Sequence, residues 1–295
     1  MISTAFKHRI IEQLRSRRSL YNGSDQQYAI TLGVSPSQLS RVMRGDTEKV
    51  LSERKWMILA ERFGVSEDGG KAWEVAATPV TEYIIAQLEE CQQNALCGIL
   101  ADEVGIGKTF AAKYYRNTHS GVVYIDCSTC KTCRLFVAAL ARELGIEKRG
   151  TFDELRQDVI LYLRSQSQRL LIILDEFGDL ARESVMEVKA LWNATEYSCG
   201  WYAMGATALK NKIEQCIERR IVGWSEVFDR LGHQFQRVSP DGKDDADEFK
   251  RRQAVAVIMA NMPDVTNAQL REIVLSTDGN LRRIHQRIIA NRGAA

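Results

Sequence analysis

The segment at residues 102–109, which reads DEVGIGKT, groups residue types that bind phosphate groups. Its glycines at positions 105 and 107 let the backbone curl so that amide groups point at phosphate oxygens. Lys108 can reach the β- and γ-phosphates of a nucleotide, and the Thr109 hydroxyl can ligate Mg²⁺. A strand-like run precedes the segment and a helical pattern follows it, as a phosphate loop requires. The residues that the motif assigns to ATP are Val104, Gly105, Ile106, Gly107, Lys108, Thr109 and Phe110.

The first position of this loop departs from the usual motif, because Asp102 stands where a glycine is usual. That position begins the loop and touches phosphate less than the later positions do. An acid there can weaken nucleotide affinity.

A second group of reactive residues follows the apolar run LLIIL at residues 170–174. An uninterrupted run of this kind is typical of a strand buried on both faces of a parallel sheet. Asp175 stands at the carboxyl end of that strand, where open α/β sheets bind ligands, and can hold Mg²⁺ through water. Glu176 can orient and deprotonate an attacking water. Together with the phosphate loop, this pair predicts that the chain hydrolyses ATP.

The elements that must position these residues alternate between strands and helices, which predicts a mostly parallel α/β sheet. The predicted strands are 95–101, 122–125, 170–174 and 201–204, and the helices among them are 81–94, 109–117, 135–144, 152–165 and 183–195. Short helices fill residues 1–65, and helices return at 247–262, 267–276 and 280–291. We therefore predict three domains: an all-α module at 1–70, an α/β P-loop core at 71–238 and a helical lid at 239–295.

The bulk composition is that of a globular protein, with 45% hydrophobic and 26% charged residues. An odd count of seven cysteines and the lack of a secretory signal predict unpaired thiols in a reducing cytoplasm. No apolar run approaches the roughly 20 residues of a membrane span, so we expect no membrane partner. The net charge of the chain is only +2. The excess of basic residues in the first 47 positions is compatible with nucleic-acid binding.

Residues 26–44 read as a helix-turn-helix. Gly33 allows the turn, Ser35 can cap the second helix, and Leu39 and Val42 lie inward at helical spacing. The outer side of that helix suits base edges and phosphates of double-stranded DNA. Its predicted DNA contacts are Ser35, Ser37, Gln38, Arg41 and Arg44. The alternative is a small helical module that binds another protein.

The order of these parts resembles the AAA+ ATPases, and more closely the ATP-dependent regulators of transposition typified by phage Mu transposition protein B and the Tn7-type regulators. The resemblance covers most of the chain. It rests on the phosphate loop, on Asp175 and Glu176 after their strand, and on the N-terminal helix-turn-helix. Three further segments agree with it in order and spacing: MGAT at 204–207, VFDR at 227–230 and GNLR at 279–282.

The resemblance implies roles for three residues beyond the phosphate loop. Thr207 would be the polar sensor after the fourth strand, although the family often has that residue at the position of Ala206. Arg230 would be an arginine finger that reaches the nucleotide of a neighbouring subunit, and Arg282 would be the lid sensor. An ordinary exposed arginine is the alternative for both.

The resemblance also implies that loops of the core grip DNA inside a helical filament. The candidates are the loop after the strand at 122–125 and the next connection, with Lys131, Arg134, Lys148, Arg149 and Thr151. A solvated loop is the alternative. Cys127, Cys130 and Cys133 in the first loop have the spacing of metal ligands, but three thiolates need a fourth partner and no second such pair is present.

Three functions follow from these features. The first is a transposition regulator that forms a homo-oligomeric filament on target DNA with ATP, stimulates a transposase and disassembles on hydrolysis. The second is a replication initiator or helicase loader, which usually carries its DNA-binding module after the lid. The third is a repressor switched by ATP, which would not need Glu176. The early helix-turn-helix and the intact Glu176 favour the first function.

Overall fold

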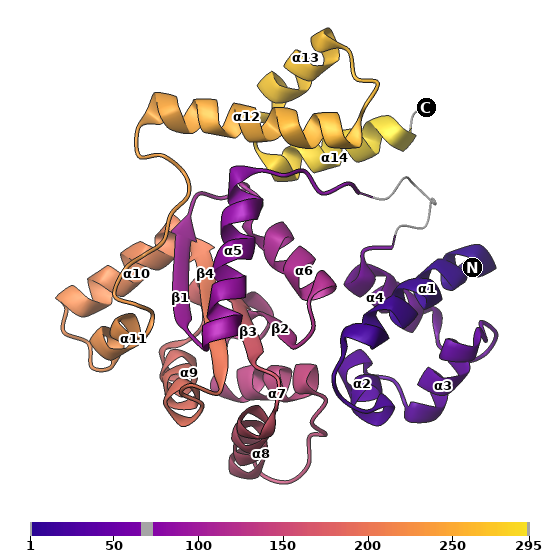
Figure 1. Ribbon diagram of the computed structural model, residues 1–295, viewed down its shortest axis with the longest axis vertical. Helices are drawn as coiled ribbons and strands as arrows, with labels where there is room; N and C mark the ends of the chain where they lie inside the picture. Colours follow the sequence, from indigo (N-terminus) through magenta and orange to yellow (C-terminus); the bar gives the residue numbers. More distant parts are fainter. Residues whose placement is uncertain (1, 66–72, 294–295) are drawn as a thin grey trace.

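The computed structural model describes residues 2–65 and 73–293, which form a helical module, an α/β core and a helical lid (Figure 1). The module contains α1 (Thr4–Leu20), α2 (Asp25–Leu32), α3 (Pro36–Arg44) and α4 (Glu53–Phe63). The helices of the core are α5 (Pro79–Asn94), α6 (Lys108–Thr118), α7 (Cys133–Leu144), α8 (Phe152–Ser165), α9 (Arg182–Ala194), α10 (Thr207–Glu218) and α11 (Trp224–Arg230), with short 3-10 turns η1 (Cys127–Thr129) and η2 (Phe177–Asp179). The lid contains α12 (Lys243–Asn261), α13 (Asn267–Thr277) and α14 (Leu281–Gly293).

The core is built on a parallel sheet of four strands in the order β1-β4-β3-β2. The strands are β1 (Cys97–Asp102), β2 (Val122–Asp126), β3 (Leu170–Asp175) and β4 (Cys199–Ala206). Their carboxyl ends lie at one edge of the sheet, where Asp102 pairs with Ala206 and Asp126 pairs with Asp175. The predicted α/β fold with a parallel sheet is therefore confirmed.

A short segment at Gln236 extends the sheet beyond β1. The Gln236 amide donates to the Ile99 carbonyl at 2.9 Å, and the Gln236 carbonyl accepts from the Ala101 amide at 3.1 Å. The segment runs parallel to β1 and leads directly into the lid. The sequence analysis did not anticipate this extension, nor helices α10 and α11.

Helices cover both faces of the sheet, so every residue of the central strand β3 is buried. Leu171 and Ile173 pack with α5 and α6 on one face, whereas Leu170, Ile172 and Leu174 pack with α7, α8 and α9 on the other. This alternation is what a parallel strand in a doubly covered sheet requires. It fixes the direction of Asp175 at the end of β3.

The module and the lid each have a separate apolar core. In the module, the fully buried Trp56 is surrounded by apolar residues of α1, α2, α3 and α4, such as Ile10 and Leu39. In the lid, Ile258 of α12 meets Ile273 of α13 and Ile284 of α14. The predicted boundary at 70/71 lies outside the described residues, so the division into domains stays a prediction.

Two further properties concern the whole described part of the chain. All seven cysteines lie within it, and each is a free thiol. Among its helices, none combines the length and the apolar character needed to cross a membrane.

We predict that Gly200→Ala destabilises the core. A Cβ at Gly200 on β4 would lie 2.3 Å from the carbonyl oxygen of Cys91 on α5, which is backbone and cannot rotate away. The expected loss is about 1–3 kcal/mol of unfolding free energy, measured by urea denaturation. Gly178→Ala is the matched control, since a Cβ there would make only ordinary contacts at 3.7 Å. Equal stability of the two variants would contradict the close approach of α5 to β4.

Candidate functional site

The phosphate loop connects the buried end of β1 to the first turn of α6. Gly105 and Gly107 have φ values of 79° and 103°, in the left-handed region that favours glycine. Gly107 stands at the N-cap of α6 and has no side chain to cap the helix, so the first amides of α6 can face a ligand. The predicted contacts Val104, Ile106, Thr109 and Phe110 lie in this loop or in the first turn of α6. The geometry is that of an anion-binding helix terminus.

Lys108 is held at the base of this loop. Its side chain is buried, and Nζ donates to the carbonyl oxygens of Asp102 at 2.9 Å and Glu103 at 2.5 Å. Burial lowers the pKa of Lys108, whereas the nearby Asp102, Glu176 and Asp175 carboxylates act in the opposite direction. The ammonium group therefore lies where the loop and the end of β3 meet.

Asp175 is buried at the end of β3 and is fixed by two donors. The Tyr124 hydroxyl donates to its Oδ2 at 2.7 Å, and the Glu176 amide donates to its Oδ1 at 3.0 Å. Tyr124 lies on β2, and the sequence analysis did not name it. Tyr124 could have been predicted as a neighbour of the site, because it lies on β2, which ends at Asp126 beside Asp175.

Glu176 adopts a left-handed backbone with φ 51°, which is unusual for a residue other than glycine. Such conformations cost free energy and are concentrated at functional sites. Burial, and then the neighbouring Asp175, raise the pKa of Glu176 above its ordinary value. A carboxylate with a raised pKa is a better proton acceptor, which suits a general base.

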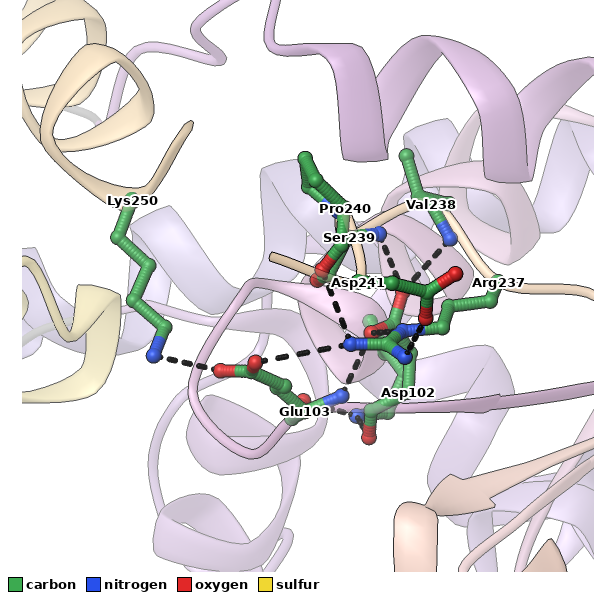
Figure 2. Close-up of polar contacts among 9 residues, drawn as sticks. Asp102, Glu103, Arg237, Val238, Ser239, Pro240, Asp241 and Lys250 are labelled. Atoms are coloured by element: carbon green, nitrogen blue, oxygen red, sulfur yellow. Dashed lines mark hydrogen bonds and ion pairs between the residues drawn. The ribbon is translucent and has the colours of Figure 1, made fainter. Parts of the chain in front are cut away.

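Asp102 turns out to hold the loop to the start of the lid (Figure 2). Its carboxylate is fully buried, and Oδ2 accepts from the amides of Val238 at 2.8 Å and Ser239 at 3.0 Å. Its Oδ1 accepts from the Glu103 amide at 2.7 Å and lies 3.7 Å from Nε of Arg237. The departure from glycine thus has a structural role that the sequence analysis missed.

Glu103 continues this network into the lid. Its Oε2 lies 2.6 Å from Nζ of Lys250 on α12, and its Oε1 lies 3.9 Å from Arg237 (Figure 2). The hydrogen bond to Glu103 raises the pKa of Lys250. Two consecutive acids of the loop therefore connect it to the chain on either side of the hinge between core and lid.

The lid also reaches the loop through the main chain. The Leu281 amide, at the first residue of α14, donates to the Gly105 carbonyl at 2.9 Å. A Cβ at Gly105 would lie 2.3 Å from the Asn280 side chain, and the φ of 79° at this position favours glycine beneath the lid. Arg282 is exposed in the first turn of α14, next to this contact. The predicted lid sensor is thus near the loop, although its role stays a prediction.

Comparison with known proteins agrees with this geometry. Residues 91–212, from α5 to α10, match a protein-family model described as an AAA domain. No curated protein matches the sequence.

Two solved structures share the fold at low identity. Cdc6p from Pyrobaculum aerophilum is 17% identical with a TM-score of 0.50, and the match covers 69% of this chain and 58% of that chain. The Aeropyrum pernix Orc1 protein, solved in complex with DNA, is 12% identical with a TM-score of 0.47 over 75% of this chain and 66% of that chain. This chain therefore spans less than two thirds of either structure. The fold is that of the AAA+ P-loop ATPases, whereas the closer resemblance to transposition regulators stays a proposal.

Two residues with implied roles lie at opposite ends of the AAA+ sheet. Thr207 is exposed at the start of α10, directly after Ala206, which pairs with Asp102. Arg230 is bound to Glu196 of the same chain at 2.9 Å, and its charge acts on Cys97 at the amino end of β1. Arg230 therefore lies away from its own phosphate loop. An action on a neighbouring subunit stays a prediction.

In the helical module, several of the predicted DNA contacts bind other residues of the module. The Ser35 hydroxyl accepts from the Gln38 amide at 3.2 Å, and Gln38 Oε1 accepts from the Ser35 amide at 3.0 Å, which forms a capping box on α3. Arg41 binds Asp46 at 3.0 Å. Ser37 and Arg44 are exposed on the same helix. Ser35 therefore caps α3 as predicted, whereas the contacts of Ser35 and Gln38 with DNA stay a prediction.

The predicted DNA contacts of the core lie in two places, one at the start of α7 and one after its end. Lys131 binds Asp179 at 3.0 Å, and Arg134 is exposed in the first turn of α7. The other three, Lys148, Arg149 and Thr151, follow the last turn of α7. This helix has 12 residues and is therefore about 18 Å long. The two groups therefore lie at opposite ends of α7, and their contact with DNA stays a prediction.

The three cysteines of the loop after β2 do not form a metal centre with other described residues. Cys127 and Cys130 are buried, and Cys133 begins α7. Within the described ranges, no group of three or more His, Cys, Asp or Glu side chains is arranged to hold a metal ion. Cys127 and Cys130 instead pack as apolar side chains within the core of the α/β domain.

We predict that restoring the usual glycine destabilises the protein. In Asp102→Gly, the buried amides of Val238 and Ser239 lose their acceptor, at a cost of about 2 kcal/mol or more. The unfolding free energy from urea denaturation measures this loss. Asp102→Asn is the matched control, since it keeps one acceptor oxygen in the same shape and should lose less. A glycine variant as stable as the parent would contradict the assigned role.

Proposed function

We propose that this chain is a DNA-binding ATPase of the AAA+ type, in which bound ATP controls assembly on duplex DNA and hydrolysis ends it. The observation that carries the proposal is the meeting of three parts at one edge of the sheet. Lys108 lies in the phosphate loop, Asp175 and Glu176 follow β3, and α14 contacts the loop through Leu281. A lid on the nucleotide loop lets binding alter the arrangement of the lid against the core.

The residues present fit Mg²⁺ and ATP. The uncapped amides at the start of α6 suit phosphate oxygens, and the Thr109 hydroxyl and the Asp175 carboxylate are oxygen donors of the kind that Mg²⁺ prefers. When bound, Mg²⁺ would neutralise charge on the phosphates. Lys108 would leave the loop carbonyls for a phosphate oxygen, and Glu176 would take the proton of the attacking water. Arg230 of a neighbouring subunit and Arg282 would add positive charge.

Two roles on DNA suit such a switch. A replication initiator or helicase loader has the support of the fold shared with Cdc6p. A transposition regulator, which would assemble as a filament and stimulate a transposase, has the support of the motif order and of the helical module before the AAA domain. In either role, the exposed Ser37 and Arg44 of α3 would meet duplex DNA.

The proposal is tested by measuring duplex binding and ATP turnover in matched variants. Lys108→Ala should weaken ATP-dependent DNA binding by about ten-fold or more, because nucleotide and DNA binding are coupled. Glu176→Gln should retain assembly but lose turnover by roughly 10²–10⁴-fold, as expected without a general base. Lys210→Ala, an exposed lysine on α10, is the control and should behave as the parent. Full ATP-dependent binding by Lys108→Ala would overturn the coupled mechanism.

Electron microscopy of the Glu176→Gln variant on plain duplex DNA separates the two roles. A continuous ATP-dependent filament supports the transposition regulator. Discrete rings or small oligomers at separate positions support the initiator or loader. Equal binding with and without ATP would contradict both.

Tyr124→Phe provides a separate prediction for the magnesium site. Without the hydroxyl, Asp175 loses the donor that fixes its Oδ2. Partners that orient a metal ligand typically contribute 10–100-fold to metal affinity, so we expect the Mg²⁺ concentration for half-maximal ATP hydrolysis to rise about ten-fold. Tyr114→Phe on α6 is the control. An unchanged Mg²⁺ dependence in Tyr124→Phe would show that Asp175 does not need this partner.

A further inference from the structure

A cavity of about 90 Å³ lies at the seam between the helical module and the core. We call it the seam cavity. The module lines it with Arg17 of α1 and Arg62 of α4, and the core lines it with Arg116 of α6 and Glu143 of α7. It lies away from the phosphate loop, because Arg116 is in the last turn of α6, whereas Lys108 is in the first.

The charges that face the seam cavity do not balance. Arg62 binds Glu143 in a bidentate manner, with distances of 3.2 Å and 2.7 Å between nitrogen and oxygen atoms. Arg116 lies 3.9 Å from the same carboxylate, which is already engaged. Arg17 donates one guanidinium hydrogen to the Asn117 carbonyl. One carboxylate therefore faces three guanidinium groups.

Several donors at the seam cavity lack an acceptor. Nε of Arg17 is buried without a hydrogen bond. The side chain of Arg116 is only 18% exposed, and among the described residues its partner is the Glu143 carboxylate at 3.9 Å, beyond hydrogen-bond distance. Burial lowers the pKa of Arg116 to about 10. The charges of Arg62 and Arg17 also lower this pKa, whereas the charge of Glu143 raises it. Buried donors of this kind are costly unless a partner satisfies them, so the cavity favours an anion.

We propose that the seam cavity binds an oxyanion of the phosphate class, held by Arg17 and Arg116 with support from Arg62. Guanidinium groups present forked donors that match phosphate oxygens, and they retain their charge when buried. The volume suits a single phosphate group rather than a whole nucleotide. The phosphate can belong to a small molecule or to the backbone of DNA. This site is distinct from the ATP site and does not depend on the proposed function.

An anion in the seam cavity would contact both the helical module and the core. An anion there would bridge α1 and α4 of the module to α6, which carries Lys108 at its other end. Phosphate binding would therefore stabilise the docking of the module on the AAA domain. It would also link the orientation of α3 to the helix that begins the nucleotide site.

The test uses the full chain with Lys108→Ala as the background, so that phosphate binding at the nucleotide loop is weakened. Thermal unfolding is followed in sodium phosphate and in sodium chloride at equal ionic strength and pH. We expect a saturable rise of the melting temperature in phosphate that chloride does not reproduce. The same curve in both salts would overturn the proposal.

Two further substitutions change the cavity in opposite directions. Arg116→Gln should weaken phosphate binding by about ten-fold or more, because it removes charged donors. Glu143→Gln should tighten it, since Glu143 is the one acid among the described residues that line the cavity. Lys210→Gln is the control, because Lys210 lies on α10, is 46% exposed and is not part of the cavity lining. A misfolded variant cannot bind more tightly, so the opposite sign for Glu143→Gln separates anion binding from a general loss of structure.

Calorimetric titration of phosphate, with and without saturating duplex DNA, identifies the source of the phosphate. If duplex DNA abolishes the phosphate signal and Arg116→Gln weakens duplex binding, the occupant is a backbone phosphate. If duplex DNA leaves the signal unchanged, the occupant is a small phosphorylated molecule. Identical phosphate affinity in Arg116→Gln, Glu143→Gln and the background would overturn the proposal, and the three arginines would then only join the module to the core.

Discussion

The buried carboxylate of Asp102 is the interaction on which the nucleotide edge of this protein depends. A buried carboxylate is costly unless donors surround it, and three main-chain amides do so here. Two of these amides belong to the chain that follows the Gln236 segment and enters the lid. The same side chain thus ends β1, fixes the edge of the sheet and sets the point from which the lid departs.

Much of the fold could be predicted because its signals are local. Helix α8 (Phe152–Ser165) was predicted with its observed limits, and in the structure the side chains of Thr151 and Glu154 cap its start. Helices α10 and α11 were missed, and neither has a side-chain cap at its start. The extended conformation at Gln236 could not be predicted from the adjacent sequence, because hydrogen bonds with β1 hold this segment against the sheet.

The candidate site divides in the same way. Lys108, Asp175 and Glu176 were found because each stands at the end of a recognisable strand or at the start of a helix. Tyr124 contacts Asp175 across 51 positions, and Asp102 contacts Val238 across 136 positions. Contacts at such separations are made by the folded sheet and have no local pattern. The partners of the surface arginines were hardest to predict. The sequence pattern of an exposed arginine is the same whether it binds DNA or a neighbouring acid, as Arg41 binds Asp46.

The hydrogen bond from the Leu281 amide to the Gly105 carbonyl joins main chain to main chain. Every amino acid except proline supplies that amide, so ordinary substitutions at position 281 cannot remove the donor. The lid can consequently change its side chains over evolutionary time while it keeps the same anchor on the loop. Genetic screens of point substitutions would overlook this contact, although it joins the lid to the loop that is proposed to bind phosphate.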